Sequence, residues 1–589
     1  MPKKPTPPPS SPPPKNANTN LHATAKAGTA PLTADNSPHR WPDGALVYHI
    51  YPRSFMDSNG DGVGDLAGIT QRLEYIKSLG AGTIWLSPFY PSPMADFGYD
   101  VANYCDVDSI FGTLDDFKAL LAAAHELDIR VLVDLVPNHT SDEHPWFTAA
   151  RQSKDNAYSD WYIWRDALSV DGAGNPQPPN NWRDALSGGP AWQWVPERQQ
   201  FYLHSFTTKQ PDLNWTNPAV REAMKEVMRF WLNIGVDGFR VDAVYWMAKH
   251  PLLHDDAINP DYVEGEDLRY YALKHNNSRG WPAVYAYLSE LAEVLHEPPY
   301  QAAPRFMVTE AYPDRHNPLP AYLNFYASVD PKVAAPFNFE GLTLPWYAPE
   351  WRKFLRSFHS ALRQFSNLCV PSYAFGNHDQ PRLASRLGEA AARSAAVLLL
   401  TLPGMVFLYY GDELGMKDVA IPADQIQDPG AAGDPKHHLG RDPERTPMQW
   451  SSEPNAGFST AARTWLPLAE DYQQYNVVTE TADPDSTLSL YRTLGQLRRQ
   501  SESLQFGSLT MLETDSDQVL AFIRTGAQGA KNYLTVINFA AETVSLQLDV
   551  QIYKKLVSSA LQAAPAEQPT VPAGTVVLQP HEGALYQLV

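Results

Sequence analysis

The regular alternation of short apolar runs with amphipathic stretches constrains the fold of this chain more than any other feature. Strand-like apolar runs recur with helical stretches between many of them, a pattern that predicts a parallel sheet with helices on its outer face. The eight candidate strands of this series lie at residues 46–51, 83–87, 131–136, 238–244, 306–310, 335–339, 373–377 and 406–410. Eight such units predict a closed (β/α)8 TIM barrel, in which catalytic groups lie where the strands run out into loops.

Three segments do not follow this alternation. Residues 1–38 carry almost no large apolar side chain, so we expect a disordered Pro-rich arm. Residues 140–214 are too long for a simple loop and predict a small domain inserted after the third strand. Residues 504–589 change to alternating β runs, typical of an antiparallel β-sandwich domain. The barrel is therefore assigned to residues 39–139 and 215–503.

Charge and cysteine content exclude several classes of protein. The net charge of −20 leaves no basic footprint for nucleic acid or for an anionic membrane surface. Cys105 and Cys369 are the two cysteines, too few for a disulfide framework, and we expect two buried free thiols. The first residues lack the apolar core of a signal peptide, and no apolar run is long enough to span a bilayer. These observations predict a cytoplasmic protein without a membrane or nucleic-acid partner.

The most distinctive short motif is Gly-Phe-Arg240-Val-Asp242-Ala243, at the end of the fourth predicted strand. Residues i and i+2 of a strand point to the same face, so Arg240 and Asp242 share one small space. A guanidinium beside a carboxylate keeps that carboxylate ionised, as a nucleophile requires. Taken alone, the pair is equally consistent with a buried salt bridge at a strand end.

Polar side chains also follow three other predicted strands of the barrel. A histidine at one strand end is often a packed core residue, but four such ends in one barrel favour a catalytic site over packing. The groups are Asp134, Asn138 and His139 after the third strand, Glu310 after the fifth, and Asn377, His378 and Asp379 after the seventh.

These segments resemble the four signature regions of glycoside hydrolase family 13, the α-amylase family. The resemblance covers the whole chain after the N-terminal arm. Three further motifs, at residues 51–55, 210–215 and 445–450, are similar to those of the α-glucosidase and oligo-1,6-glucosidase group rather than the α-amylases proper.

The resemblance implies a role for each matching residue. Asp242 would be the nucleophile, Glu310 the acid/base, and Asp379 the group that binds sugar hydroxyls and stabilises a distorted ring. The implied substrate contacts are Asp96 and Tyr99 (hydrogen bonding and stacking), His139 and His378 (hydroxyl contacts), Phe206 (an aromatic wall), Arg240 (orienting Asp242), Ala243 (linkage preference) and Arg441 (closing the pocket).

A retaining glycosidase needs two close carboxyls, one ionised and one protonated, and the apolar run before Glu310 favours the protonated form there. The resemblance implies an exo-acting α-glucosidase on a small di- or oligosaccharide, and Ala243 favours α-1,4 linkages. A transglucosylase or sugar isomerase acting on sucrose or maltose would use the same residues.

A non-catalytic transporter heavy chain would need a membrane span and eroded carboxylates, and a carbohydrate-binding module would not need the catalytic triad. The chain is expected to be a monomer or homodimer.

A glycine-rich acidic loop follows the first predicted strand. Alternating oxygen ligands in such a loop suit Ca²⁺, with Mg²⁺ as the alternative ion. The family resemblance implies a structural Ca²⁺ site and no organic cofactor. The ligand candidates are Asp57, Asn59, Asp61, the backbone near Val63, and Asp65.

Overall fold

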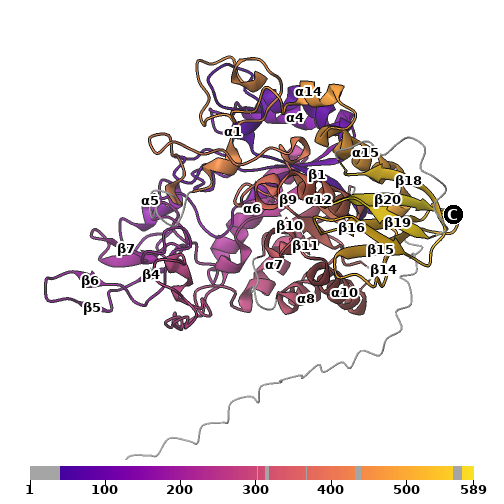
Figure 1. Ribbon diagram of the computed structural model, residues 1–589. Coiled ribbons are helices and arrows are strands. Elements are labelled where there is room, and N and C mark those ends of the chain that lie inside the picture. The colour runs from indigo at the N-terminus through magenta and orange to yellow at the C-terminus, as the bar shows by residue number, and fades with distance from the viewer. Residues whose placement is uncertain (1–39, 302, 312–317, 367, 431–439, 561–573) are drawn as a thin grey trace, which may run out of the picture.

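The computed structural model describes residues 40–301, 303–311, 318–366, 368–430, 440–560 and 574–589. The predicted disordered arm, residues 1–38, lies outside the described residues. A central barrel carries the insert on one side and the C-terminal sheets on the other (Figure 1).

The predicted barrel is present as one eight-stranded parallel sheet, in the order β11-β10-β9-β3-β2-β1-β13-β12. Each strand lies within a few residues of its predicted range. The strands are β1 Leu46–Ile50, β2 Thr83–Leu86, β3 Arg130–Leu135, β9 Gly238–Val241, β10 Phe306–Thr309, β11 Ala334–Pro336, β12 Ser372–Ala374 and β13 Met405–Tyr409. All are buried except for Arg130 at the start of β3, as expected for strands covered on both faces.

Seven of the eight strand junctions are backbone ladders, and the junction between β11 and β12 is made by a side chain. Pro336 at the end of β11 has no N–H to give to a ladder. The Ser372 hydroxyl instead donates to the Pro336 carbonyl at 2.7 Å and accepts from the Asn338 amide at 3.1 Å. One serine thus closes the barrel where proline prevents regular pairing.

Amphipathic helices cover the outside of the barrel. In α6, Asn217 caps the first turn, Pro218 takes the first helical position, and Gly235 ends the helix with a φ of 117°. The helices of the barrel are α1 Pro52–Phe55, α2 Leu66–Gln71, α3 Leu73–Ser78, α4 Leu114–Glu126, α6 Pro218–Ile234, α7 Ala283–Val294, α8 Leu319–Ser328, α9 Glu340–Thr343, α10 Ala348–Phe365, α11 Leu383–Leu387, α12 Glu389–Thr401, α14 Val477–Ala482 and α15 Thr487–Gln500. Among the described residues, no helix is long and apolar enough to cross a bilayer.

The segment after β3 has its own small core. It contains α5 Pro145–Ala150, a three-stranded sheet in the order β4-β8-β7, and a β5–β6 hairpin that projects from the molecule (Figure 1). The strands are β4 Trp164–Arg165, β5 Ser169–Val170, β6 Pro176–Gln177, β7 Trp192–Val195 and β8 Gln200–Leu203. Its core consists of Trp182, Ala191, Trp192, Phe201 and Leu203.

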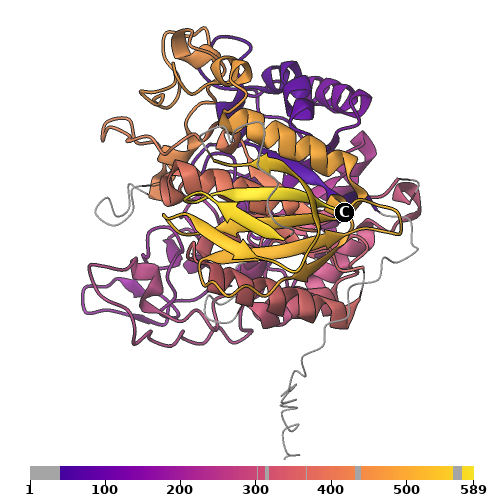
Figure 2. The ribbon, with the colours of Figure 1, turned by 45° about the vertical axis from the view of Figure 1, so that its right-hand side comes forward.

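The C-terminal part is antiparallel, with a five-stranded sheet, β14-β15-β16-β20-β18, and a two-stranded sheet, β17-β19 (Figure 2). The short helix α16 Glu502–Gln505 precedes it. The strands are β14 Ser508–Met511, β15 Val519–Thr525, β16 Tyr533–Asn538, β17 Val544–Gln547, β18 Ile552–Ser558, β19 Thr575–Leu578 and β20 Gly583–Leu588. The sequence pattern did not predict β14 and β18, because neither alternates cleanly between buried and exposed residues.

The two cysteines are free, as predicted, but the expectation that both are buried is wrong. Cys105 and Cys369 are each partly exposed. Both lie in connecting segments rather than within a barrel strand or one of its covering helices, so the core does not enclose them completely.

We predict that Gly238→Ala destabilises the barrel. A Cβ atom at Gly238 would lie 1.8 Å from the Phe306 carbonyl oxygen, so β9 and β10 would have to separate. Overpacking of this kind costs about 2–3 kcal/mol, measured as the free energy of unfolding in urea. Gly82→Ala is the matched control, because its Cβ would meet nothing within 4 Å. Equal stability of the two variants would contradict this account.

Candidate active site

One buried guanidinium joins three carboxyls at the carboxyl end of the barrel. Arg240 Nη1 lies 2.7 Å from Asp242 Oδ1 and 2.9 Å from Asp134 Oδ1, and Nη2 lies 2.7 Å from Glu310 Oε1. Asp134 and Arg240 are register partners on β3 and β9, while Asp242 and Glu310 directly follow β9 and β10. Three adjacent strands therefore bring two predicted catalytic residues to one cation.

The charges of this cluster do not balance if every carboxyl is ionised. Burial raises the pKa of Asp134 to about 7, against the opposing effect of Arg240. Burial also raises the pKa of Asp242 well above its ordinary value; Arg240 opposes the shift, while Glu310 and Asp134 add to it. The expectation that Arg240 alone keeps Asp242 ionised is therefore incomplete, because the cation is shared among three carboxyls. The cluster retains protons at a pH where exposed carboxyls have lost them.

Ala243 links the two predicted catalytic carboxyls through the backbone. It has a φ of 45°, unusual for a residue with a side chain, and its N–H donates to Glu310 Oε2 at 2.9 Å. Strain of this kind is found at sites where the backbone must hold a functional group. The turn after Asp242 thus orients Glu310 as well as ending β9.

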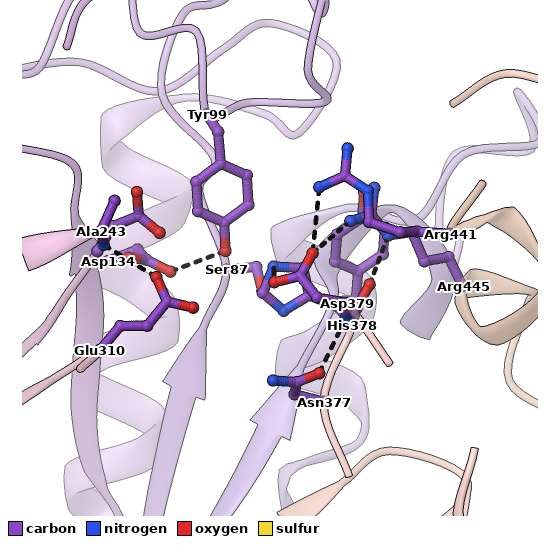
Figure 3. Close-up of polar contacts among 12 residues, drawn as sticks. Ser87, Tyr99, Asp134, Ala243, Glu310, Asn377, His378, Asp379, Arg441 and Arg445 are labelled. Atoms are coloured by element: carbon purple, nitrogen blue, oxygen red, sulfur yellow. Dashed lines mark hydrogen bonds and ion pairs between the residues drawn. The ribbon is translucent and has the colours of Figure 1, made fainter. Parts of the chain in front are cut away.

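A second charged cluster forms the opposite side of the site (Figure 3). Arg441 lies 2.6 Å from Asp96 and 3.1 Å from Asp379, and Arg445 lies 2.9 Å from the same oxygen of Asp379. These cations, together with His378, hold the pKa of Asp379 well below its usual range despite burial. Asp379 is thus an ionised acceptor for ligand hydroxyls.

Asp428 is a component of this cluster that the sequence analysis missed. It lies 2.8 Å from Arg441 Nη2, also accepts from Arg441 Nε at 3.0 Å, and is fully buried. Burial acts to raise the pKa of this carboxyl, but the Arg441 guanidinium outweighs that effect and holds the pKa well below its usual range. Asp428 belongs to an irregular segment without a recognisable motif, so no local signal pointed to it.

The predicted aromatic and imidazole groups line the space between the two clusters. The Tyr99 ring stacks on His378 with centroids 5.3 Å apart, and its hydroxyl donates to Asp134 at 3.2 Å. Phe206 packs edge-on against His139 at 5.2 Å. Burial lowers the pKa of His139 to about 4 and that of His378 well below its usual value, so both imidazoles are neutral at physiological pH.

All the predicted catalytic and substrate-contacting residues except Arg240 line one cavity of about 760 Å³. Arg240 lies directly beneath it, bonded to Asp242 and Glu310. The structure thus brings every one of these predicted residues together at the carboxyl end of the barrel.

A polar chain that the sequence analysis did not assign supports His139. Gln210 donates to Asp96 at 2.9 Å and lies 3.1 Å from His139 Nε2. Lys249 pairs with the buried Asp212 at 2.5 Å. These residues join the inserted segment to the barrel, so the insert positions part of the binding site.

The predicted metal loop is ordered by its own backbone. Asp57 accepts hydrogen bonds from the amides of residues 59, 60 and 62, and Asp65 accepts from those of residues 58 and 68. Asp61 accepts from Val63 at 2.8 Å through one oxygen only. Within the described part of the chain, no group of three His, Cys, Asp or Glu side chains is arranged to hold a metal ion. The donor types suit a hard cation, but their present arrangement serves the loop itself.

Comparison with known proteins assigns the family. The profile of the α-amylase catalytic domain matches residues 49–507. The chain belongs to the α-amylase family. It is similar to Maltase 1 of Drosophila virilis, at 40% identity over 93% of this chain and 87% of that protein. It is also 34% identical to the oligo-1,6-glucosidase of Parageobacillus thermoglucosidasius, over 93% of this chain and 99% of that protein.

Among solved structures, this α-amylase family member is similar to XgtA, described as an α-glucosyl transfer enzyme. The TM-score is 0.83 at 35% identity, covering 94% of this chain and all of that chain. The predicted family is thus confirmed, and with it the class of enzyme: the protein is a glycoside hydrolase with a TIM barrel and a C-terminal β-domain.

We predict that Asp428→Asn weakens substrate binding in this family member. The substitution leaves the size of the side chain but removes the charge that anchors Arg441, so KM should rise about 10-fold, since hydrogen bonds to charged groups are worth roughly twice neutral ones. Steady-state kinetics on a chromogenic α-glucoside provides the measurement. Asp424→Asn, an exposed change in the same segment, is the control. A KM equal to that of the control would show that Asp428 does not position Arg441.

Proposed function

We propose that this protein is a retaining, exo-acting α-glucosidase. It releases glucose from the non-reducing end of short α-glucosides, with α-1,4 linkages preferred, through a covalent glucosyl-enzyme. The observation that carries the proposal is the sharing of one guanidinium by Asp242 and Glu310.

The separation of the two carboxyls decides between retaining and inverting chemistry. Retaining glycosidases hold them about 5 Å apart, whereas inverting enzymes leave room for a water molecule between carboxyl and sugar. Asp242 and Glu310 bond to the two terminal nitrogens of the same guanidinium, both at 2.7 Å. This spacing supports the retaining route.

The reaction then proceeds in two steps. The reactive state of the cluster is the one in which Asp242 is ionised and the shared proton lies on Glu310. The Asp242 oxygen then attacks the anomeric carbon while Glu310 gives its proton to the glycosidic oxygen, so the bond to the leaving sugar breaks and a glucosyl ester forms. Glu310, now a carboxylate, takes a proton from water as the water oxygen attacks the same carbon. The ester breaks, Asp242 is freed and Glu310 is protonated again. Arg240 stabilises the negative charge that moves between the two carboxyls.

The charged wall around Arg441 supports exo-cleavage. The ion pair of Arg441 with Asp96, together with the Asp379 and Asp428 contacts, closes one side of the cavity. Such a wall accommodates the terminal hydroxyls of a non-reducing glucosyl unit and blocks further sugar units beyond it. Cutting in the middle of a chain would need an open groove.

Glucosyl transfer is the second candidate, since the similar structure XgtA is described as a transfer enzyme. The same glucosyl-enzyme serves both outcomes, and they differ in whether water or a sugar hydroxyl takes the glucosyl group. Ala243, which follows the nucleophile and lines the cavity, supports the preference for α-1,4 linkages in either case.

We predict that the protein releases glucose from maltose and sucrose faster than from isomaltose, with the α-anomer of glucose appearing first. Product analysis by chromatography, with NMR for the anomer, is the measurement.

Asp242→Ala should lower kcat by at least about 10⁴-fold, because the covalent step is lost. Retained activity in Asp242→Ala, or β-glucose as the first product, would contradict the mechanism. Oligosaccharides in place of free glucose would favour transfer.

We also propose that the loop from Asp57 to Asp65 binds Ca²⁺ in a structural role. Carboxylate and amide oxygens alternate in it, and an oxygen that accepts one N–H keeps a further lone pair.

We predict that Ca²⁺ at about 1 mM raises the midpoint of thermal unfolding by several degrees, compared with the same protein in a chelator. Asp61→Ala should abolish this difference. Asp106→Ala, in another loop, should leave the Ca²⁺ effect intact. Indifference of the wild-type midpoint to Ca²⁺ would refute the proposal.

A further inference from the structure

The active-site cavity extends well beyond the residues that would hold one glucosyl ring. Its volume of about 760 Å³ lies in the range of pockets that enclose a whole small ligand. Asp96, Asp379 and Arg441 form its closed side. Beyond the catalytic strand ends and the inserted segment, the lining includes η2 (Val244–Met247), the segment between η2 and α7, and the region around α8 and α9.

The place of Glu310 indicates which part of the cavity receives the second sugar. An acid that protonates the glycosidic oxygen must lie beside the bond that breaks, so the leaving sugar extends from Glu310 away from the closed side. Glu310 follows β10, and the strand that pairs with β10 on the side away from β9 is β11. The chain that follows β11 reaches the cavity at Phe339 and Glu340.

Glu340 is an unused carboxylate in this wall. It is the first residue of α9, and its backbone N–H donates to Asn338 Oδ1 at 3.0 Å. Its carboxylate forms no hydrogen bond or ion pair with any residue that the structure describes, although it is partly buried. Burial raises the pKa of the Glu340 carboxyl. A partly desolvated acceptor without a partner is costly, and this cost is removed when a ligand supplies donors.

The lining of the cavity that contains Glu340 suits a sugar rather than a cation. Arg279 also lines the cavity; its guanidinium lies over the Trp246 ring, 5.0 Å from the centroid, and over Tyr270 at 6.0 Å. It forms no hydrogen bond within the described residues, so its N–H groups are free to donate. A carboxylate acceptor, a guanidinium donor and aromatic rings together match the alternating hydroxyls and apolar faces of a pyranose.

We propose that Glu340 binds the hydroxyl groups of the sugar next to the scissile bond, both when that sugar leaves and when a second sugar accepts the glucosyl group. Glu340 thereby determines specificity: it favours substrates whose leaving group carries hydroxyl groups. The inference rests on the proposed α-glucosidase function and adds the residue that recognises the second ring.

The test compares two substrates that share the glucosyl unit but differ in the aglycone. Maltose carries a sugar with hydroxyls there, whereas p-nitrophenyl α-glucoside carries a flat ring without them. The ratio of kcat/KM for maltose to that for the aryl glucoside should fall about 10-fold or more in Glu340→Ala, since a hydrogen bond to a charged group is lost. Glu340→Gln keeps the shape and one acceptor, so its ratio should fall between those of the wild type and Glu340→Ala.

Glu350→Gln is the matched control. Glu350 is likewise partly buried, lies in α10 and does not line the cavity, so its variant should keep the wild-type ratio. Circular dichroism and thermal unfolding show whether each variant is folded. If Glu340→Ala does not fold, the test uses Glu340→Gln, which preserves the shape of the side chain.

Three outcomes would overturn the inference. An unchanged ratio would show that Glu340 does not contact the second ring. An equal loss on both substrates, with a displaced alkaline limb of the pH–rate profile, would show that Glu340 acts through the charge of Glu310 instead. A wild-type protein that cleaves neither substrate would refute the α-glucosidase proposal itself, which separates that failure from the other two.

The same variants report on transfer. In high maltose, binding of an acceptor sugar by Glu340 predicts that the share of oligosaccharide among the products falls in Glu340→Ala relative to Glu350→Gln. A transfer share that stays equal in the two variants would contradict the acceptor role, even where the maltose to aryl glucoside ratio falls.

Discussion

The buried guanidinium of Arg240 is the interaction on which the rest of the site depends. It ties together the ends of β3, β9 and β10 through Asp134, Asp242 and Glu310. Burying an unpaired arginine in the barrel core would be strongly unfavourable, and so would burying three unpaired carboxyls. The arginine and the carboxyls can be buried because they pair with one another. Since one positive charge cannot neutralise three negative ones, the cluster retains a proton at a pH where exposed carboxyls are ionised.

In the second charged cluster two arginines pair with three carboxylates, so the charges are closer to balance than around Arg240. Around Asp379 the cations Arg441 and Arg445 outweigh the burial of the carboxyl, so its pKa is lowered rather than raised. One side of the cavity therefore holds carboxyls that retain a proton, and the other holds carboxylates with a fixed negative charge. Tyr99 lies between them, stacked on His378 and bonded to Asp134, and couples the two sides (Figure 3). The two charged clusters are thus separated in space by one aromatic ring.

The residues predicted from motifs do lie together at one cavity, whereas residues outside those motifs were not predicted from the sequence. Arg240 and Asp242 lie two positions apart, so strand geometry alone places them together. The Asp428 carboxylate is paired with Arg441, a contact that the intervening chain does not reveal. Glu340 has an ordinary sequence context, and only the placement of its neighbours shows that no described residue pairs with its carboxylate. The strands β14 and β18 were missed because their alternation is irregular, whereas each barrel strand was found because burial on both faces gives a continuous apolar run.

By itself, the sequence determined the barrel, the insert after the third strand, the C-terminal β-domain and the family, because hydrophobic periodicity and short motifs are local properties of the chain. Only the tertiary structure decided how one cation is divided among three carboxyls, which reverses the direction expected for the pKa of Asp242. It also decided that Arg441 binds Asp428 and that the Glu340 carboxylate, in the cavity wall, has no partner among the described residues. The physical reason is that charge sharing, desolvation and the absence of a partner depend on groups brought together from distant parts of the chain.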